Sequence, residues 1–278
     1  MAKIIDGRAV SLKVKDSVKN EIAENKLDVS LAVVIVGDNS ASRIYVNNKK
    51  KACEYCGIIS HEYALPESTS EDELLQLVEA LNNDDKINGI LVQLPLPKHI
   101  NENRIIERIS PIKDVDAFHA ENVGKIMIGN YSFLPCTPAG VMELIHSTGV
   151  LVKGKECVVI GRSNIVGKPM AMLLLHEDAT VTICHSKTEN LAEVCSRADV
   201  LVSAVGIAEF VKPEMVKQGA VVIDVGMNRN ADGKLCGDVC FDEVEKKASF
   251  ITPVPGGVGP MTIAMLMKNT LMARKIQK

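Results

Sequence analysis

The sequence predicts an α/β protein built from two domains, each with a parallel sheet covered by helices. Short apolar runs typical of buried strands alternate with longer amphipathic segments from near the start of the chain. The alternation occurs in two series, which a proline-rich segment at residues 134–140 separates. Strands joined by helices favour a parallel sheet, because each crossover helix returns the chain to the same end of the sheet. A length of 278 residues suits two domains of medium size.

The first series predicts an N-terminal α/β domain over residues 1–138. After an amphipathic opening segment, its predicted elements are a buried strand at 30–37, a helix at 42–57, a strand at 59–65, a helix at 71–83 and a strand at 87–95. Ser70 and Glu73 form the S-x-x-E pattern of a capping box, which predicts where the second of these helices begins.

The second series predicts a C-terminal domain over residues 139–260. Its predicted elements are a helix to about residue 146, a strand, turn and helix at 156–178, and strands at 180–186, 199–206, 220–227 and 250–254. The last segment, TIAMLMKNTLMARKI, has a helical pattern and no strand after it. We therefore expect residues 261–278 to pack back on the first domain as a C-terminal helix.

Composition excludes several classes of function. The net charge of −3 and the interspersed acidic and basic residues provide no positive field for nucleic acid. No apolar run approaches the roughly 18 residues that a membrane span needs. The opening segment carries charges among its apolar positions, unlike a signal peptide. We expect a cytoplasmic protein that binds neither nucleic acid nor membrane.

The eight cysteines are too few and too irregularly spaced for a disulfide framework. Cys53 and Cys56 fall on one face of a predicted helix. A zinc site would need a second compact pair, and the spacing of Cys236 and Cys240 fits one poorly. We expect free core thiols and no metal.

Residues 158–169, VVIGRSNIVGKP, lie between a predicted strand and a predicted helix, where a Rossmann fold places its phosphate-binding turn. Gly161 and Gly167 are present, but Ser163 and Val166 stand where the fingerprint has two further glycines. A second strand about 20 residues later supports the interpretation. The segment therefore predicts a Rossmann cofactor-binding domain, with a purely structural turn as the alternative.

The end of the next strand distinguishes between the two nicotinamide cofactors. A site specific for NAD would place an acidic residue there, against the ribose hydroxyls. This chain has His185, Ser186 and Lys187 instead, and Arg162 follows the first glycine of the turn. These residues favour NADP.

Four polar positions in the first domain are candidates for chemistry. Tyr45 and Lys49 lie four residues apart on a predicted helix and so share a face. Burial of a lysine there would lower its pKa toward acid–base use. Gln93 follows a strand at the end where α/β proteins bind ligands. Of Asp114 and Asp116, one could contact a ligand while the other serves as a cap. Each position also fits a purely structural role.

Several segments together resemble one known family, the bifunctional methylenetetrahydrofolate dehydrogenase/methenyltetrahydrofolate cyclohydrolases. They are PGGVGPMT (255–262), ILVQLPLP (90–97), YVNNK (45–49), KDVD (113–116) and GRSNIVGKP (161–169). The resemblance runs nearly end to end. It departs at Ala117, Ala120 and Cys240, where the family usually has Gly, Pro and Asp. We expect these departures to change local loop shape and not the reaction.

The resemblance implies an oxidoreductase and hydrolase of one-carbon metabolism, serving purine biosynthesis. It implies NADP-dependent oxidation of 5,10-methylenetetrahydrofolate, followed by hydrolysis of 5,10-methenyltetrahydrofolate to 10-formyltetrahydrofolate. It also implies a homodimer, and a cleft between an N-terminal catalytic domain and a C-terminal Rossmann domain. Two alternatives stay open: a dehydrogenase without the hydrolytic activity, and a non-catalytic NADP-sensing protein.

The resemblance also implies roles for individual residues. Lys49 is the expected acid–base group, with Gln93 orienting it, Tyr45 stacking on the aminobenzoyl ring and Asp116 binding the pterin. The expected NADP-binding residues are Gly161, Arg162, Ser163, Ser186 and Ile207. The proline- and glycine-rich loop would approach the folate closely through Pro255, Gly256 and Gly257, because glycines remove side chains while prolines hold the backbone path.

Overall fold

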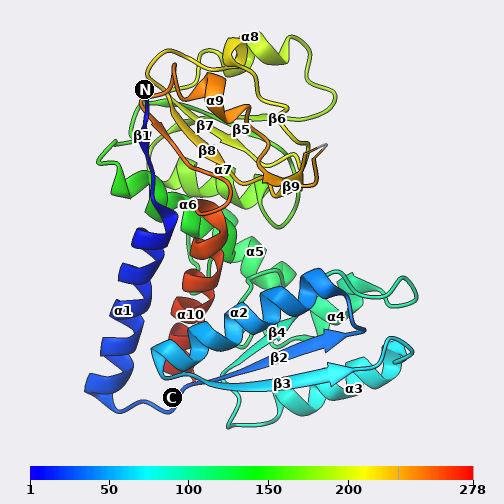
Figure 1. The fold of residues 1–278 in the computed structure, drawn as a ribbon. Helices are drawn as coiled ribbons and strands as arrows, with labels where there is room; N and C mark the ends of the chain where they lie inside the picture. The colour runs from blue at the N-terminus through cyan, green and yellow to red at the C-terminus, as the bar shows by residue number, and fades with distance from the viewer. Residues whose placement is uncertain (231, 278) are drawn as a thin grey trace. The chain divides into compact units, whose positions relative to one another are not determined.

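The computed structural model describes residues 1–230 and 232–277, in which strands and helices alternate along the chain (Figure 1). The chain divides into two compact units. The three-stranded unit comprises Leu12–Cys136 and the residues from Ile263 onward, and the six-stranded unit comprises Met1–Ser11 and Thr137–Thr262. The predicted α/β class is confirmed, since both sheets are parallel. Among the described residues, no helix has the length and apolar character needed to cross a membrane.

The three-stranded unit has its strands in the order β3-β2-β4. These are β2 (Ser30–Val36), β3 (Ile59–Leu65) and β4 (Gly89–Val92). The helices that contribute to this unit are α1 (Gly7–Asn25), α2 (Ser40–Cys56), α3 (Glu71–Asn82), α4 (Glu102–Arg108), α5 (Ala120–Met127) and α10 (Val258–Ile276). Every residue of the central strand β2 is buried, which explains its uninterrupted apolar sequence.

The capping box predicted at the start of α3 is confirmed. Ser70 Oγ accepts a hydrogen bond from the Glu73 backbone N–H at 3.3 Å, and Glu73 Oε2 accepts one from the Ser70 N–H at 2.8 Å. Two of the N–H groups that a helix start leaves unpaired are thereby satisfied. The buried residues Leu74, Val78 and Leu81 follow at helical spacing and attach α3 to the core.

The six-stranded unit has its strands in the order β1-β11-β8-β7-β5-β6, all of them parallel. They are β1 (Lys3–Ile4), β5 (Glu156–Ile160), β6 (Thr180–Cys184), β7 (Val200–Ser203), β8 (Val221–Asp224) and β11 (Phe250–Ile251). The remaining elements are α6 (Cys136–Ser147), α7 (Gly167–His176), α8 (Leu191–Cys195), the 3₁₀ helix η1 (Pro213–Met215), α9 (Phe241–Val244) and an antiparallel pair, β9 (Asn228–Arg229) with β10 (Leu235–Cys236). Strands β5, β7 and β8 are buried almost throughout, as their apolar sequences predict.

The edge strand β1 is a feature that the sequence did not indicate. Lys3 pairs with Phe250 and Ile4 with Ile251, and the Ile5 N–H donates to the Ile251 oxygen at 2.8 Å. Both residues of β1 are exposed, so no apolar alternation marks the strand. Backbone pairing with a segment almost 250 residues away therefore places the start of the chain in the six-stranded unit.

Two glycines allow the turn after β5 to form. Gly161 has φ +127, and a Cβ there would clash with the backbone oxygen of Ala204 at the end of β7. A Cβ at Gly167 would clash with the oxygen of Gly161. The chain can therefore fold tightly from β5 into α7 only where these positions lack side chains. This packing puts the start of α7 directly beside the turn that follows β5, and that turn packs against the end of β7.

Candidate active site

Lys49 is a buried lysine of the three-stranded unit. Its side chain projects from α2 and is 9% exposed, while Lys50 and Lys51 are exposed. Lys49 Nζ donates to Gln93 Oε1 at 2.9 Å. Gln93 Nε2 in turn donates to the Leu94 oxygen at 2.6 Å, which fixes the orientation of the amide and turns its oxygen toward the lysine.

Gln93 and Asp116 lie at the same end of the sheet. Gln93 directly follows β4, and its N–H donates to the Val34 oxygen at 2.8 Å. The segment before Asp116 runs beside β4, since the Ile90 N–H donates to the Lys113 oxygen at 2.8 Å and Asp114 forms a parallel bridge with Ile90. The bridge register carries Asp116 to the level at which β4 ends, so the predicted first-domain groups gather there.

Burial perturbs both charged groups of this site. It lowers the pKa of Lys49, although the charge of Asp116 acts in the opposite direction. It raises the pKa of Asp116 to about 6, although the charge of Lys49 lowers it. Each group is therefore stabilised in its charged form chiefly by the other, and both can change protonation state closer to neutral pH than exposed side chains would. Burial also raises the pKa of the Tyr45 hydroxyl, which lies one helical turn before Lys49.

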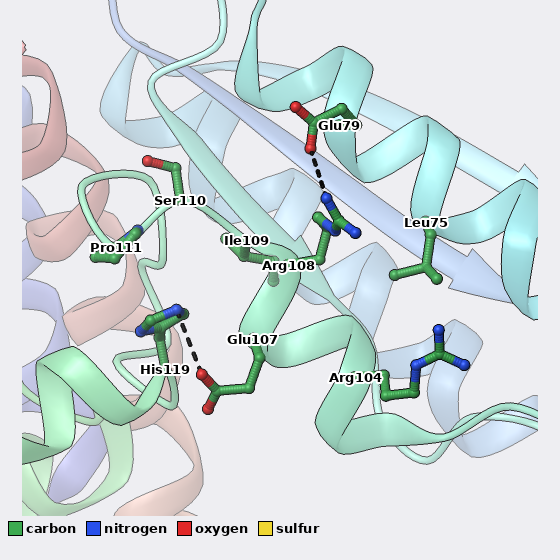
Figure 2. Close-up of a pocket in the computed structure, with 9 residues that line it drawn as sticks. All are labelled: Leu75, Glu79, Arg104, Glu107, Arg108, Ile109, Ser110, Pro111 and His119. Atoms are coloured by element: carbon green, nitrogen blue, oxygen red, sulfur yellow. Dashed lines mark hydrogen bonds and ion pairs between the residues drawn. The ribbon is translucent and has the colours of Figure 1, made fainter.

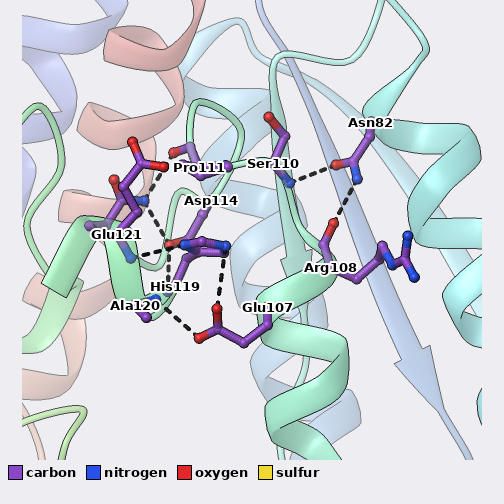
Figure 3. A network of polar contacts seen from close by, with 10 residues as sticks. Asn82, Glu107, Arg108, Ser110, Pro111, Asp114, His119, Ala120 and Glu121 are labelled. Carbon is purple, nitrogen blue, oxygen red and sulfur yellow. Dashed lines mark hydrogen bonds and ion pairs between the residues drawn. The ribbon is translucent and has the colours of Figure 1, made fainter. Parts of the chain in front are cut away.

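The two aspartates of the KDVD segment have different surroundings. Asp114 is 1% exposed, and its Oδ2 accepts hydrogen bonds from the His119 N–H and from Asn122 Nδ2, both at 2.9 Å. Figure 3 shows the network that continues from His119 to Glu107, whose Oε1 accepts from the Ala120 N–H at 3.1 Å. The Asp114 side chain thus holds the loop between Asp114 and Asn122 in place. Asp116, in contrast, is partly exposed.

Cys136 and Asn269 support Asp116, and sequence reasoning assigned a role to neither. Cys136 Sγ lies 3.8 Å from Asp116 Oδ1, and burial raises the thiol pKa well above its usual value, so the thiol stays protonated. Asn269 Nδ2 donates to the oxygens of Val115 and Leu134, both at 2.8 Å. The one available signal was an asparagine within the apolar pattern of the last helix.

The three departures from the family pattern take distinct backbone positions. Ala117 has φ +58 and is fully buried, so it adopts a left-handed conformation that glycine adopts more easily. Ala120 begins α5 and donates the N–H that Glu107 accepts, a bond that proline could not make. Cys240 is the N-cap of α9 and makes no side-chain cap hydrogen bond, whereas aspartate is a favoured N-cap. All three effects are local.

In the six-stranded unit, the residues predicted to bind the cofactor lie at the carboxyl ends of neighbouring strands. Gly161, Arg162 and Ser163 follow β5, Ser186 follows β6 and Ile207 follows β7. Because β5 lies between β6 and β7, the carboxyl ends of these strands are neighbours, where α/β sheets bind ligands. Except for Gly161, these residues are exposed.

The turn after β5 fits a phosphate-bearing cofactor. Ser163 Oγ accepts hydrogen bonds from the N–H groups of Val166 and Gly167, at 3.2 and 3.3 Å, which leaves its hydroxyl hydrogen available as a donor. The exposed Arg162 guanidinium lies beside it in the chain, and the exposed Ser186 and Lys187 follow β6. These groups suit a dinucleotide with an additional phosphate on its ribose.

The proline- and glycine-rich loop approaches backbone of its own unit. A Cβ at Gly7, where α1 begins, would clash with the Gly257 oxygen, and a Cβ at Gly257 would lie 2.7 Å from the Pro253 oxygen. Gly256 has φ +112, next to a cis peptide between Val254 and Pro255. The glycines therefore serve close packing against the start of α1.

A surface pocket of about 470 Å³ lies elsewhere in the three-stranded unit (Figure 2). Most of its ionisable side chains lie in pairs within the pocket: Arg108 lies 3.4 Å from Glu79, and His119 lies 3.5 Å from Glu107. Arg104 is paired instead with Glu71, which does not line the pocket. The pocket includes none of the predicted site residues. Within the described residues, no group of three or more His, Cys, Asp or Glu side chains is placed to hold a metal ion.

Comparison with known proteins identifies relatives over the whole length. The family model described as "Tetrahydrofolate dehydrogenase/cyclohydrolase, NAD(P)-binding domain" matches residues 135–278, and the model of the catalytic domain of the same family matches residues 5–116. The chain is 62% identical over 279 residues to the bifunctional protein FolD of Acetivibrio thermocellus, with 99% of this chain and 98% of that protein covered.

Solved structures are also similar to this chain. The bifunctional FolD methylenetetrahydrofolate dehydrogenase/cyclohydrolase of Campylobacter jejuni has a TM-score of 0.97 and 50% identity, with 100% of both chains covered. The methylenetetrahydrofolate dehydrogenase-cyclohydrolase of Trypanosoma brucei, solved with NADP and an inhibitor, has a TM-score of 0.94 and 41% identity, with 99% of this chain and 98% of that chain covered.

The electrostatic pairing of Lys49 and Asp116 predicts a pKa change in a variant. Lys49→Met removes the positive charge that lowers the Asp116 pKa, so that pKa should rise above its present value of about 6. Because the folded pKa of Asp116 exceeds the ordinary aspartate value, the free energy of unfolding falls as pH rises from the ordinary pKa to the folded pKa. In the variant this fall should continue to a higher pH. A pH titration of the Asp116 carboxyl ¹³C resonance measures the shift. Lys50→Met, at an exposed position, is the control, and an unchanged pKa in Lys49→Met would contradict the pairing.

Proposed function

This chain belongs to the tetrahydrofolate dehydrogenase/cyclohydrolase family, and we propose that it catalyses two successive reactions of folate. It oxidises 5,10-methylenetetrahydrofolate with NADP to 5,10-methenyltetrahydrofolate, and it hydrolyses that product to 10-formyltetrahydrofolate. The observation that carries the proposal is the buried Lys49, held by Gln93 beside Asp116. In this assignment folate is bound by residues 1–138 with the helix at 261–278, and NADP is bound by residues 139–260.

Hydrolysis needs a group that takes up and returns a proton. Water attacks the electrophilic methenyl carbon, and the neutral amine of Lys49 accepts the proton that the water loses. The resulting ammonium then gives a proton to the ring nitrogen as its bond to that carbon breaks, and the hydroxyl proton leaves to solvent as the formyl C=O forms. Burial favours the neutral amine by lowering the Lys49 pKa, and Gln93 holds the amine in one position.

The neighbouring groups bind and orient the folate. Above pH 6 the Asp116 carboxylate predominates and accepts hydrogen bonds from the amino group and the ring N–H of the pterin. Tyr45 stacks on the aminobenzoyl ring, one helical turn from Lys49. Pro255, Gly256 and Gly257 supply further substrate contacts through backbone. In the oxidation these residues act by orientation alone, because the hydride acceptor is the cofactor.

The cofactor is NADP, which when bound supplies the nicotinamide ring that accepts hydride. Gly161, Ser163 and Ile207, at the carboxyl ends of β5 and β7, would hold it, and the start of α7 would favour its phosphates. Arg162 and Ser186 would donate hydrogen bonds to its 2′-phosphate. Two features support this choice: both side chains are exposed, and no acidic residue follows directly at the end of β6.

We further propose a cytoplasmic homodimer that supplies formyl groups for purine biosynthesis. Free thiols suit a reducing compartment, and all eight cysteines are free.

Within the described residues, β3 pairs with a strand on one side only, and its Ile59 is 54% exposed, so this edge suits contact with a second copy. Nucleic acid is not among the proposed partners, given the net charge of −3. A monomeric mass in analytical ultracentrifugation would contradict the dimer.

One assay tests the main proposal. Purified protein is given 5,10-methylenetetrahydrofolate with NADP or with NAD, and the reduced cofactor, the methenyl compound and the formyl product are followed separately. We expect all three to form, faster with NADP. Reduced cofactor and methenyl compound without enzymatic hydrolysis would indicate a dehydrogenase alone. Binding of NADP without turnover of any reduced folate would indicate a non-catalytic protein.

Removal of the Lys49 amine should separate the two activities. Lys49→Met keeps the apolar stem and deletes the acid–base group, so hydrolysis of methenyltetrahydrofolate should fall by about 10²–10⁴-fold. Oxidation should survive at least in part, so the methenyl compound should accumulate with NADPH. Lys50→Met and Lys51→Met, at exposed positions of the same helix, should resemble the parent. Hydrolysis at the parental rate in Lys49→Met would show that the proton acceptor is another group.

Replacement of Arg162 should affect one cofactor more than the other. Arg162→Ala removes a charge-assisted hydrogen bond to the 2′-phosphate, so the KM for NADP should rise about 10–100-fold. The KM for NAD, which has no such phosphate, should change much less. Steady-state kinetics with both cofactors measure the difference, and equal increases would remove Arg162 from the 2′-phosphate site.

A further inference from the structure

Asp238 is a fully buried aspartate that the proposed chemistry does not use. It follows β10 and is 0% exposed. Its Oδ2 accepts hydrogen bonds from Val205 N (2.7 Å), Ser203 Oγ (3.1 Å) and Gly206 N (3.3 Å), and its Oδ1 accepts from Asn228 Nδ2 (2.9 Å) and Ile207 N (3.1 Å). Five donors thus converge on one carboxylate.

The donors show what this carboxylate holds. Three of them are the consecutive backbone N–H groups of Val205, Gly206 and Ile207, the segment that leaves the end of β7. A carboxylate accepts hydrogen bonds at both oxygens and donates none, so it can hold such a row of N–H groups, and its charge strengthens each bond. Hydrogen bonds to the buried Asp238 fix the backbone of this segment, while the Ile207 side chain is 54% exposed.

Asp238 is itself held by a second buried carboxylate, Asp224 at the end of β8. Asp224 Oδ1 accepts from the Asp238 N–H, and its Oδ2 accepts from the Val239 N–H, both at 2.9 Å. A Cβ at Gly237 would clash with the Asp224 carboxylate, and a Cβ at Gly226 would clash with that of Asp238. The ends of the adjacent strands β7 and β8 are therefore joined through two carboxylates, with glycines beside them to provide the space.

We propose that Asp238 is a positioning residue for NADP, acting through the backbone of residues 205–207. This rests on the proposed function, which places NADP at the carboxyl ends of β5, β6 and β7. An apolar side chain held out into solvent on a fixed backbone offers a preorganised contact for a planar ring, and a bound ligand then loses less free energy in ordering the loop. Because Asp238 is 0% exposed, it acts through the backbone on cofactor affinity and not on the chemistry of hydrolysis.

The variant Asp238→Asn tests the proposal because it preserves shape. In either orientation its amide turns an N–H₂ group toward N–H or O–H donors, which leaves donors unpaired and loosens residues 205–207. We expect the NADP Kd, measured by calorimetry, to rise about tenfold or more, and the KM for NADP to rise with it. Hydrolysis of methenyltetrahydrofolate, assayed without NADP in the same preparation, should stay at the parental rate.

Asp199→Asn is the matched control. Asp199 belongs to the same unit and also accepts a backbone hydrogen bond, from the Glu156 N–H at 3.1 Å, but at the amino ends of the strands. Its NADP Kd should stay within about twofold of the parent. A folded Asp238→Asn variant with the parental NADP Kd overturns the proposal, as does an equal rise in Asp199→Asn.

A second variant decides the matter if Asp238→Asn fails to fold. Ser203→Ala deletes one donor to the carboxylate and leaves the charge and four donors in place. A rise in the NADP Kd with hydrolysis unchanged supports the proposal, and an unchanged Kd overturns it. Calorimetry with NADP needs no folate turnover, so failure of the proposed folate reactions would remain distinguishable from failure of this inference.

Discussion

The burial of one ammonium group constrains the whole three-stranded unit. A lysine that is 9% exposed loses most of its hydration, and such a charge is retained only with compensating partners. Gln93 Oε1 provides a hydrogen bond and Asp116 an opposite charge. The end of β4, the segment that runs beside it and the helix α2 must all be in register for these partners to meet.

Burial also explains why Lys49 and Asp116 are suited to proton transfer. Burial drives Lys49 toward the neutral amine and Asp116 toward the neutral acid, while the charge of each favours ionisation of the other. The two groups in their charged forms and in their neutral forms have the same net charge. A small change in surroundings, such as a substrate that excludes water, can therefore shift the balance between them.

Elements with local sequence patterns were predicted well, and those that depend on distant pairing were not. The apolar runs at β2, β5, β7 and β8 and the capping box at Ser70 follow from local spacing. The two-residue strand β1 depends on β11, at the other end of the chain. Asn269 and Asp238 act through hydrogen bonds to residues that no periodicity connects to them. Their identity as supports became apparent only once the acceptors and donors around them were known.

Asp224 and Asp116 show why a shifted pKa alone does not identify a reactive group. Burial raises the pKa of Asp224 to about 6, the same value as for Asp116. Both Asp224 oxygens nevertheless accept backbone hydrogen bonds, which join the end of β8 to the segment after β10. Asp238 receives five donors and holds a loop. The hydrogen bond that Asp116 receives comes from a thiol at 3.8 Å, which is weak, and the side chain is partly exposed. A carboxylate is available to a ligand when its oxygens can still accept hydrogen bonds and solvent can reach it. A carboxylate whose oxygens already accept several hydrogen bonds from the chain maintains the fold.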